Sequence, residues 1–403
     1  MKGKDLKPHI GIFGRRNIGK SSLINIMTGQ DVAIVSNHAG TTTDPVKKSM
    51  EIFGVGPVVI TDTAGIDDSG ELGEMRIEKS LAVIPNVDLA ILLITNNSFD
   101  TFERSIIKSF QEFDTPFILV HGKSDIQELK ESTRKKIADE IQGTPISSFS
   151  IFNKQSLDDL ISLIIKTIPE NIYQKKSLLK GLIKPKDIVL LITPVDSEAP
   201  EGRMILPQQM AIRDVLDNDC ICITVKETEL ADFLTTGLKP SLAITDSQAF
   251  VIVSKLIPID IPLTSFSIVL ARYRGNFKAY IDGTPHISKL QDGDNILMLE
   301  SCTHQISCED IGRFKLPKWL QEYDGKQLNF DFASGLTSFP KPIEEYQLII
   351  QCGGCVVTQK QLNNRLKPAI RKGVAVSNYG MAIAYVTGIF DRVVEPFKKL
   401  NYD

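Results

Sequence analysis

The chain has 403 residues, of which 42% are hydrophobic and 24% are charged, so it is long enough for two or three globular domains and is not disordered. Its formal net charge of −3 argues against a protein that binds nucleic acid through the phosphates over a broad basic surface. Residues 1–7 lack the apolar core of a signal peptide, and no apolar run approaches the roughly 18 residues of a membrane helix. We therefore expect a cytoplasmic protein that does not bind a membrane. From its net charge we expect that it does not bind nucleic acid.

From residue 9 to about 169, short apolar runs alternate with segments of helical spacing. This alternation is typical of a parallel sheet covered by helices. We predict strands at 9–13, 58–61, 89–95 and 117–120, and helices at 20–27 and 157–168. Residues 170–186 contain five lysines and predict a linker.

Two further alternating blocks follow the linker. The middle block predicts strands at 188–193, 221–225 and 242–245 and helices at 207–217, 227–236 and 248–256. The last block predicts strands at 265–270, 295–299 and 347–351 and helices at 277–289 and 359–369. The expected fold is therefore α/β, with a P-loop domain at 1–170, a linker at 171–183 and two smaller α/β domains at 184–262 and 263–403.

A phosphate-binding loop stands between the first predicted strand and the first predicted helix. Residues 14–21 read Gly-Arg-Arg-Asn-Ile-Gly-Lys-Ser, and the strand and helix on either side are the context that this motif requires. Backbone N–H groups of such a loop surround the β-phosphate, Lys20 reaches the β- and γ-phosphates, and the Ser21 hydroxyl binds Mg²⁺. The predicted nucleotide-binding residues of the loop are Gly14, Asn17, Ile18, Gly19, Lys20, Ser21 and Ser22.

Two later segments supply the rest of a Mg²⁺ and γ-phosphate site. Asp62 begins an Asp-Thr-Ala-Gly sequence directly after an apolar run, where a carboxylate can bind Mg²⁺ through water and the N–H of Gly65 can contact the γ-phosphate. Residues 40–44 read Gly-Thr-Thr-Thr-Asp, and Thr42 is the predicted Mg²⁺ ligand that senses the γ-phosphate. We expect Mg²⁺ to be held by Ser21 and Thr42.

The base is predicted to be guanine. Residues 122–125 read Gly-Lys-Ser-Asp, where guanine-nucleotide proteins carry a motif resembling Asn-Lys-X-Asp. Asp125 can accept from the two donors of the guanine edge and Lys123 can pack along the base, whereas adenine would leave the carboxylate unpaired. Gly122 departs from the motif, and Ser150 occupies the place of a weaker fifth motif.

These motifs give the first 169 residues a resemblance to the bacterial GTPases related to Era and TrmE. The resemblance implies slow GTP hydrolysis activated by K⁺, with Asn17 helping to hold that ion against the phosphates. Ile66 follows Gly65 where Ras-like proteins have glutamine, so a glutamine side chain does not position the attacking water. The catalytic residues implied are Asn17, Lys20, Thr42 and Gly65.

Six cysteines all lie after residue 219. Cys352 and Cys355 flank two glycines after one predicted strand, and Cys302 and His304 follow another, so both groups stand at strand ends. A soft-metal site, a zinc site, a thioredoxin-like redox pair and buried structural cysteines all fit this pattern. In the middle block, Cys220 and Cys222 alternate with isoleucines, which favours a core position for at least one of them.

The whole chain resembles HydF, the GTPase family that matures [FeFe]-hydrogenase. The resemblance rests on a GTPase followed by two domains, with Cys-X-His about 47 residues before Cys-Gly-Gly-Cys. It implies a homodimer formed by the middle domain, and a [4Fe–4S] cluster bound by Cys302, Cys352 and Cys355. It also implies that the chain carries a diiron precursor to apo [FeFe]-hydrogenase and works with radical-SAM maturases.

The resemblance does not identify the ligand of the fourth iron of the cluster. Gln351 stands where many HydF members have histidine, so the candidates are His304, Cys308, a carboxylate or an exogenous ligand. Two other functions also stay open: a GTPase of tRNA modification or ribosome assembly, which needs a basic RNA-binding surface and no cluster, and a thiol oxidoreductase that uses Cys352 and Cys355 without iron.

Overall fold

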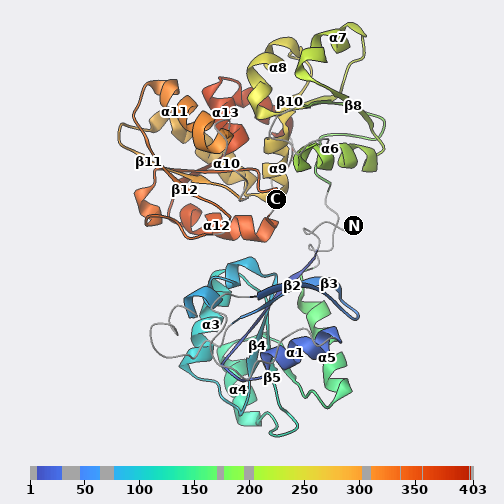
Figure 1. Cartoon of the computed structure of the whole chain (residues 1–403), viewed down its shortest axis with the longest axis vertical. Coiled ribbons are helices and arrows are strands. Elements are labelled where there is room, and N and C mark those ends of the chain that lie inside the picture. Colours follow the sequence, from blue (N-terminus) through green and yellow to red (C-terminus); the bar gives the residue numbers. More distant parts are fainter. Residues whose placement is uncertain are drawn as a thin grey trace. The chain divides into compact units, whose positions relative to one another are not determined.

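The computed structural model describes residues 7–29, 46–63, 77–169, 177–194, 204–301, 310–335, 337–355, 357–398 and 400. The chain divides into two compact units, Met1–Gln174 and Lys175–Asp403 (Figure 1). Each unit is α/β, as the alternating pattern predicts.

The first unit is built on a six-stranded sheet with the order β2-β3-β1-β4-β5-β6. Only β2 runs antiparallel, beside β3, and the other pairs are parallel. The strands are β1 (His9–Gly14), β2 (Val46–Ile52), β3 (Gly56–Asp62), β4 (Leu89–Ile94), β5 (Phe117–His121) and β6 (Ile146–Ser148).

Helices cover both faces of this sheet. α1 (Lys20–Thr28) and α5 (Lys154–Thr167) pack on one face, and α3 (Thr101–Glu112) and α4 (Glu131–Glu140) pack on the other. β4 has no exposed residue, because it lies in the middle of the sheet between two helical layers. The carboxyl ends of the parallel strands therefore meet at one edge, which is where α/β proteins bind ligands.

The middle sheet of the second unit is fully parallel, with the order β10-β9-β7-β8. Its strands are β7 (Ile188–Ile192), β8 (Ile221–Val225), β9 (Leu242–Thr245) and β10 (Leu263–Ser265). Its helices are α6 (Leu206–Asp217), α7 (Leu230–Thr235) and α8 (Phe250–Leu256).

The predicted strand at 265–270 is wrong. β10 ends at Ser265, and α9 (Phe266–Arg274) begins directly after it, with the Ser265 side chain accepting from the N–H of Ile268 as the N-cap. Most of α9 is buried on all sides, so its apolar residues form a continuous run that does not distinguish a buried strand from a buried helix. β10 pairs with β9, so residues 263–265 lie in the middle sheet and not in the last block, where the sequence placed them.

The predicted linker at 171–183 is also too long. Leu178, Leu179 and Ile183 are buried in the core of the second unit, and the N–H of Leu179 donates to Asp214 of α6. The lysines around these three apolar residues make the segment polar on average, so its composition predicts a linker although the three side chains are buried.

The last sheet is parallel as well, with the order β12-β11-β13-β14. Its strands are β11 (Asn295–Leu299), β12 (Asn329–Ala333), β13 (Leu348–Gln351) and β14 (Ala375–Asn378). The helices around it are α10 (Phe277–Gly283), α11 (Leu316–Asp324), α12 (Gln359–Arg371), α13 (Tyr379–Val386) and α14 (Phe390–Val394). One continuous hydrophobic core joins this sheet to the middle sheet.

Short helical turns complete the described chain. They are the 3₁₀ helices η2 (Ile84–Asn86), η4 (Glu227–Glu229), η5 (Ser247–Ala249), η6 (Thr284–Lys289), η8 (Ile343–Glu345) and η9 (Glu395–Phe397), and the π-helix η7 (Ile311–Lys315). Among the described residues, no helix has the length and apolar character needed to cross a membrane.

Candidate functional site

The phosphate loop lies between the end of β1 and the start of α1. Gly14 has a φ of 148°, and a Cβ there would lie 2.7 Å from the carbonyl oxygen of Leu93, so only glycine fits. Asn17 and Gly19 also have left-handed φ values of 55° and 107°. These turns are typical of a loop whose N–H groups point inward at an anion.

Lys20 begins α1 and is buried inside the loop. Its Nζ donates to the carbonyl oxygens of Gly14 (3.0 Å) and Arg15 (2.8 Å). The ammonium group therefore lies inside the loop, as expected for the lysine of a phosphate-binding loop.

The structure brings Ser21 and Asp62 together, as the Mg²⁺ assignment requires. The Ser21 Oγ lies 3.3 Å from Asp62 Oδ2, and Asp62 Oδ1 is buried without a hydrogen-bond partner among the described residues. Burial raises the pKa of Asp62, and the charge of Lys20 opposes this effect. A divalent cation would satisfy the unpartnered oxygen, so these residues fit Mg²⁺. Thr42 and Gly65 lie outside the described residues.

The guanine-motif residues lie at the carboxyl ends of β5 and β6. The N–H of Ser124 donates to the carbonyl of Phe149 (3.1 Å), and the N–H of Phe149 donates to the carbonyl of His121 (2.8 Å). These bonds hold the loop of Lys123 and Asp125 against the loop of Ser150. The sheet therefore places both predicted guanine-binding loops at the same edge as the phosphate loop.

We expect Gly122→Asn to tighten GTP binding about fivefold, because it restores one amide hydrogen bond of about 1 kcal/mol. The position accepts a side chain after a small shift of Leu93: its φ is not left-handed, and the atoms nearest to a Cβ belong to the Leu93 and Thr95 side chains, at 3.3 Å or more. Gly122→Ala is the matched control, since it fills the same space without an amide. Equal GTP dissociation constants for both variants would contradict the expectation.

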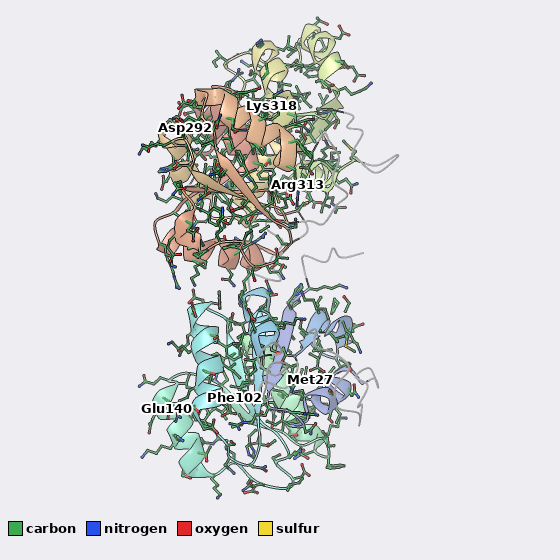
Figure 2. All side chains as sticks on the ribbon, turned by 60° about the vertical axis from the view of Figure 1, so that its left-hand side comes forward. Met27, Phe102, Glu140, Asp292, Arg313 and Lys318 are labelled. Carbon is green, nitrogen blue, oxygen red and sulfur yellow. The ribbon has the colours of Figure 1, made fainter. Side chains whose placement is uncertain are left out.

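Arg15 of the phosphate loop is tied to the start of α3, a contact that the sequence analysis missed. Its Nε and Nη2 donate to Glu103 (2.8 and 3.0 Å), and Nη2 also donates to Asp100 (2.6 Å). The guanidinium lies 4.9 Å from the ring centre of Phe102, which Figure 2 labels. Asp100 and Glu103 form the capping box of α3, so the phosphate loop and this helix end are one hydrogen-bonded assembly.

We expect Glu103→Gln to destabilise the first unit by about 2 kcal/mol, because Glu103 is only 1% exposed and its charge pairs with Arg15, whose 29% exposure screens part of the loss. Glutamine keeps the capping interaction, so the change isolates the ion pair. The exposed Arg104–Glu140 pair on α3 and α4 gives the control: Glu140→Gln should leave the thermal unfolding midpoint unchanged. Equal midpoints for both variants would refute the importance of the Arg15 contact.

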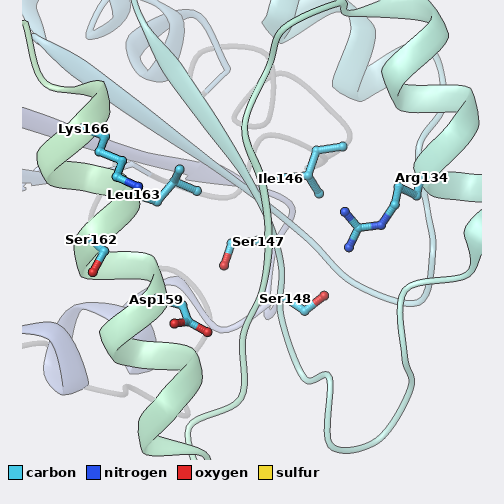
Figure 3. A pocket seen from close by; sticks show the side chains of 8 residues that line it. All are labelled: Arg134, Ile146, Ser147, Ser148, Asp159, Ser162, Leu163 and Lys166. Carbon is cyan, nitrogen blue, oxygen red and sulfur yellow. The ribbon is translucent and has the colours of Figure 1, made fainter.

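A groove of about 440 Å³ lies beside the edge strand β6 (Figure 3). Ser147 and Ser148 of β6, Arg134 of α4 and Asp159 and Lys166 of α5 are among its lining residues. None of its lining residues belongs to the predicted nucleotide site.

In the second unit, Cys352 follows β13, and its sulfur lies within hydrogen-bond distance of Ser301 and Gln351. Its Sγ accepts from the N–H of Ser301 (3.1 Å) and lies 3.2 Å from the Ser301 Oγ. Burial raises the pKa of the thiol, and the hydrogen bonds from Ser301 oppose that effect. N–H donors to sulfur are typical of metal-bound thiolates, so this position fits a soft metal such as iron.

Gln351 supplies another donor to the same sulfur. This side chain is fully buried at the end of β13, and its Nε2 lies 3.4 Å from the Cys352 Sγ and 3.0 Å from the Ser301 Oγ. Its Oε1 has no hydrogen-bond partner among the described residues. Gln351, the position at which the HydF resemblance leads us to expect histidine, therefore directs its amide nitrogen toward the Cys352 thiol.

A partly buried ion pair joins two residues that stand on either side of residues 302–309 in the sequence. Glu300 accepts from Nε and Nη2 of Arg313 (2.9 and 2.7 Å), a residue labelled in Figure 2. Arg365 of α12 donates to the carbonyl of Glu300 (3.0 Å). Ser301, the described residue before this segment, contacts Cys352 directly.

Cys302, His304 and Cys308 lie outside the described residues. Within the described part of the chain, no three His, Cys, Asp or Glu side chains form a group that could hold a metal. Cys220 is buried and its Sγ donates to the carbonyl of Lys184 (3.0 Å), which agrees with a core position. Cys222 is partly exposed on β8.

Several curated proteins resemble the first unit. A tRNA modification GTPase MnmE from Nitrosomonas europaea is 34% identical over 158 residues, which is 39% of this chain and 34% of that protein. Another MnmE, from Pelagibacter ubique, is 42% identical over 118 residues, 29% of this chain and 26% of that protein. GTPase Der from Mycoplasmopsis agalactiae is 30% identical over 194 residues, 45% of this chain and 44% of that protein. The chain thus spans about a third of the length of the first MnmE relatives it matches.

Solved structures resemble this chain more distantly than the curated proteins do. Era from Aquifex aeolicus bound to GDP and aluminium fluoride has 19% identity and a TM-score of 0.37, covering 54% of this chain and 92% of that one. The G domain of the T. maritima FeoB iron transporter has 18% identity and a TM-score of 0.32, covering 40% and 98%.

Models of known protein families match three consecutive segments of the chain. Residues 9–123 match the 50S ribosome-binding GTPase model, so the first unit is a P-loop GTPase domain that hydrolyses GTP. Residues 178–275 match the hydrogen maturase F dimerization domain, and residues 278–396 match the hydrogen maturase F tetramerization domain. The two models indicate that the chain oligomerises, whereas the sequence resemblance implied a homodimer and left higher oligomers open. Because the last two models carry one family's name and together cover more than half of the 403 residues, the chain belongs to the hydrogen maturase F family.

Proposed function

We propose that this GTPase is a scaffold that binds a [4Fe–4S] cluster in its last domain and carries a diiron precursor to apo [FeFe]-hydrogenase. The observation that carries the proposal is the succession of a GTPase domain and the two hydrogen maturase F domains, the last of which contains Cys352 among hydrogen-bond donors. The proposed GTP-binding domain is 1–170. For dimerisation and for the cluster, we propose the segments 178–275 and 278–396 that match the two hydrogen maturase F domains, in place of the bounds 184–262 and 263–403 expected from the sequence. The proposed compartment is the cytoplasm.

The proposed cluster ligands are Cys302, Cys352 and Cys355. Ser301, whose N–H donates to Cys352 Sγ, immediately precedes Cys302 in the chain, and consecutive Cα atoms are about 3.8 Å apart. Three thiolates would leave one iron of the bound cluster with a site for an exchangeable ligand. The proposed role of the protein is to orient the thiolates and donate hydrogen bonds to them.

We also propose a homodimer through the middle domain. β8 is an edge strand of its sheet and Ile221 on it is exposed, as are Val251 and Ile252 of α8. An edge strand and exposed apolar side chains each support contact with a second chain.

We expect GTP hydrolysis to be faster in K⁺ than in Na⁺, because Arg15 is neutralised by Asp100 and Glu103 and so does not supply charge to the phosphates. Asn17 is the proposed K⁺ ligand. Because its φ is 55°, Asn17→Gly removes the side chain without backbone strain and is preferable to alanine. The variant should hydrolyse GTP equally slowly in both salts. A wild-type rate that is the same in K⁺ and Na⁺ would rule out the K⁺ site.

Delivery can be measured by mixing the protein, isolated from cells that contain radical-SAM maturases, with apo [FeFe]-hydrogenase under anaerobic conditions. The hydrogenase should gain hydrogen-evolving activity, and protein carrying Cys352→Ala should give none. Equal activation by both proteins would show that the cysteine site has no part in delivery.

A further inference from the structure

Helix α9 ends at a buried arginine that contacts the cysteine turn. Arg274 is 2% exposed, and its Nη1 donates to the carbonyl oxygens of Gly354 and Val357, each at 2.6 Å. These carbonyls stand on either side of Cys355 in the sequence. One guanidinium therefore fixes the backbone before and after this cysteine.

The two glycines of the turn also lie against apolar side chains. A Cβ at Gly353 would come within 3.2 Å of Leu270, in the same helix as Arg274. Gly354 has a left-handed φ of 69°, and a Cβ there would meet Leu362 of α12 at 2.9 Å. The turn is thus packed between α9 and α12 and has little room to change its path.

The arginine and the turn belong to different domains of the family. Arg274 lies within residues 178–275, which match the dimerization domain, whereas Cys352 and Cys355 lie within residues 278–396, which match the tetramerization domain. α9 begins directly after β10 of the middle sheet. The guanidinium therefore links the framework of the dimerization domain to the backbone of the cysteine turn.

We propose that Arg274 is a positioning residue that orients Cys352 and Cys355 toward one metal cluster, an inference that rests on the proposed cluster function. Guanidinium is suited to this task because its planar group presents several N–H donors in fixed directions, so that one side chain can hold two carbonyls. A lysine ammonium is a point donor on a flexible stem and does not reproduce that geometry. Holding the turn fixes the spacing of its two thiolates before the cluster binds.

Arg274→Lys tests the proposal, with Arg392→Lys as the matched control. Arg392 of α14 also holds backbone carbonyls in the second unit, those of Ser254 (2.7 Å), Ile257 (2.8 Å) and Pro258 (3.0 Å), but none in the cysteine turn. Both full-length variants and the wild type are reconstituted anaerobically with iron and sulfide. Iron release to a chelator and the EPR spectrum of the reduced cluster are then measured.

We expect Arg274→Lys to release iron at least about tenfold faster than wild type and to change the EPR spectrum, since altered supporting contacts typically weaken metal binding by that factor. Arg392→Lys should match wild type in both. If Arg274→Lys does not fold, as judged by its thermal unfolding, Arg274→Gln takes its place, and its iron release and EPR spectrum are measured against the same expectations. Unchanged release and spectrum in a folded Arg274 variant would overturn the positioning role. A wild type that binds no cluster would instead refute the proposed function.

Discussion

Replacing Cys352 with alanine is expected to remove most of the iron from the reconstituted protein. A [4Fe–4S] cluster with only two remaining protein thiolates is weakly held, and the N–H of Ser301 would lose its sulfur acceptor. The same loss is expected for Cys302→Ala and Cys355→Ala. Iron and sulfide are measured per chain after anaerobic desalting.

Cys220→Ala and Cys222→Ala are the controls for this loss. Both cysteines lie in the middle domain, where Cys220 donates to the carbonyl of Lys184, so iron content should not change. His304→Ala and Cys308→Ala distinguish the candidates for the fourth ligand. If Cys308→Ala abolishes the cluster while added imidazole leaves the EPR spectrum of the reduced protein unchanged, the fourth iron is not open to exchange.

Asp125→Asn is expected to weaken GTP binding by about 100-fold or more. The amide replaces one acceptor with a donor, which then faces a donor of the guanine edge, and an unpaired polar group in a base pocket costs several kcal/mol. Xanthosine triphosphate, whose edge carries an acceptor at that position, should bind the variant better than GTP. Dissociation constants for GTP, ATP and xanthosine triphosphate measure the exchange of specificity.

Asp139→Asn on α4 is the matched control, because it makes the same chemical change at an exposed position outside the guanine motif. It should bind GTP like the wild type. If ATP competes with GTP equally well on the original protein, the guanine assignment is incorrect.

The nucleotide site was predictable because its chemistry is carried by short segments of consecutive residues. The motif at residues 14–21 needs a strand before it and a helix after it, and β1 and α1 supply both. Asp62 is the last residue of β3, and its contact with Ser21 results from the parallel strands β1 and β3 ending at one edge of the sheet.

The features that sequence reasoning missed depend on residues far apart in the chain. The partners of Arg15 are 85 and 88 residues away, and those of Arg274 are 80 and 83 residues away, so local spacing carries no signal for either contact. The edge strand β2 was missed because its sequence, Val-Lys-Lys-Ser-Met-Glu-Ile, is mostly polar. Helix α3 was missed although it carries two local signs, the capping sequence at Asp100 and Glu103 and the helical spacing of Ile106, Ile107 and Phe110.

Iron and sulfide analysis of the anaerobically purified or reconstituted full-length protein, with its absorption spectrum, tests the central claim most directly. The account predicts a brown protein with about four iron atoms and four sulfides per chain and a broad absorption of thiolate-to-iron charge transfer. A colourless protein that binds GTP but cannot be reconstituted with iron and sulfide would contradict the account.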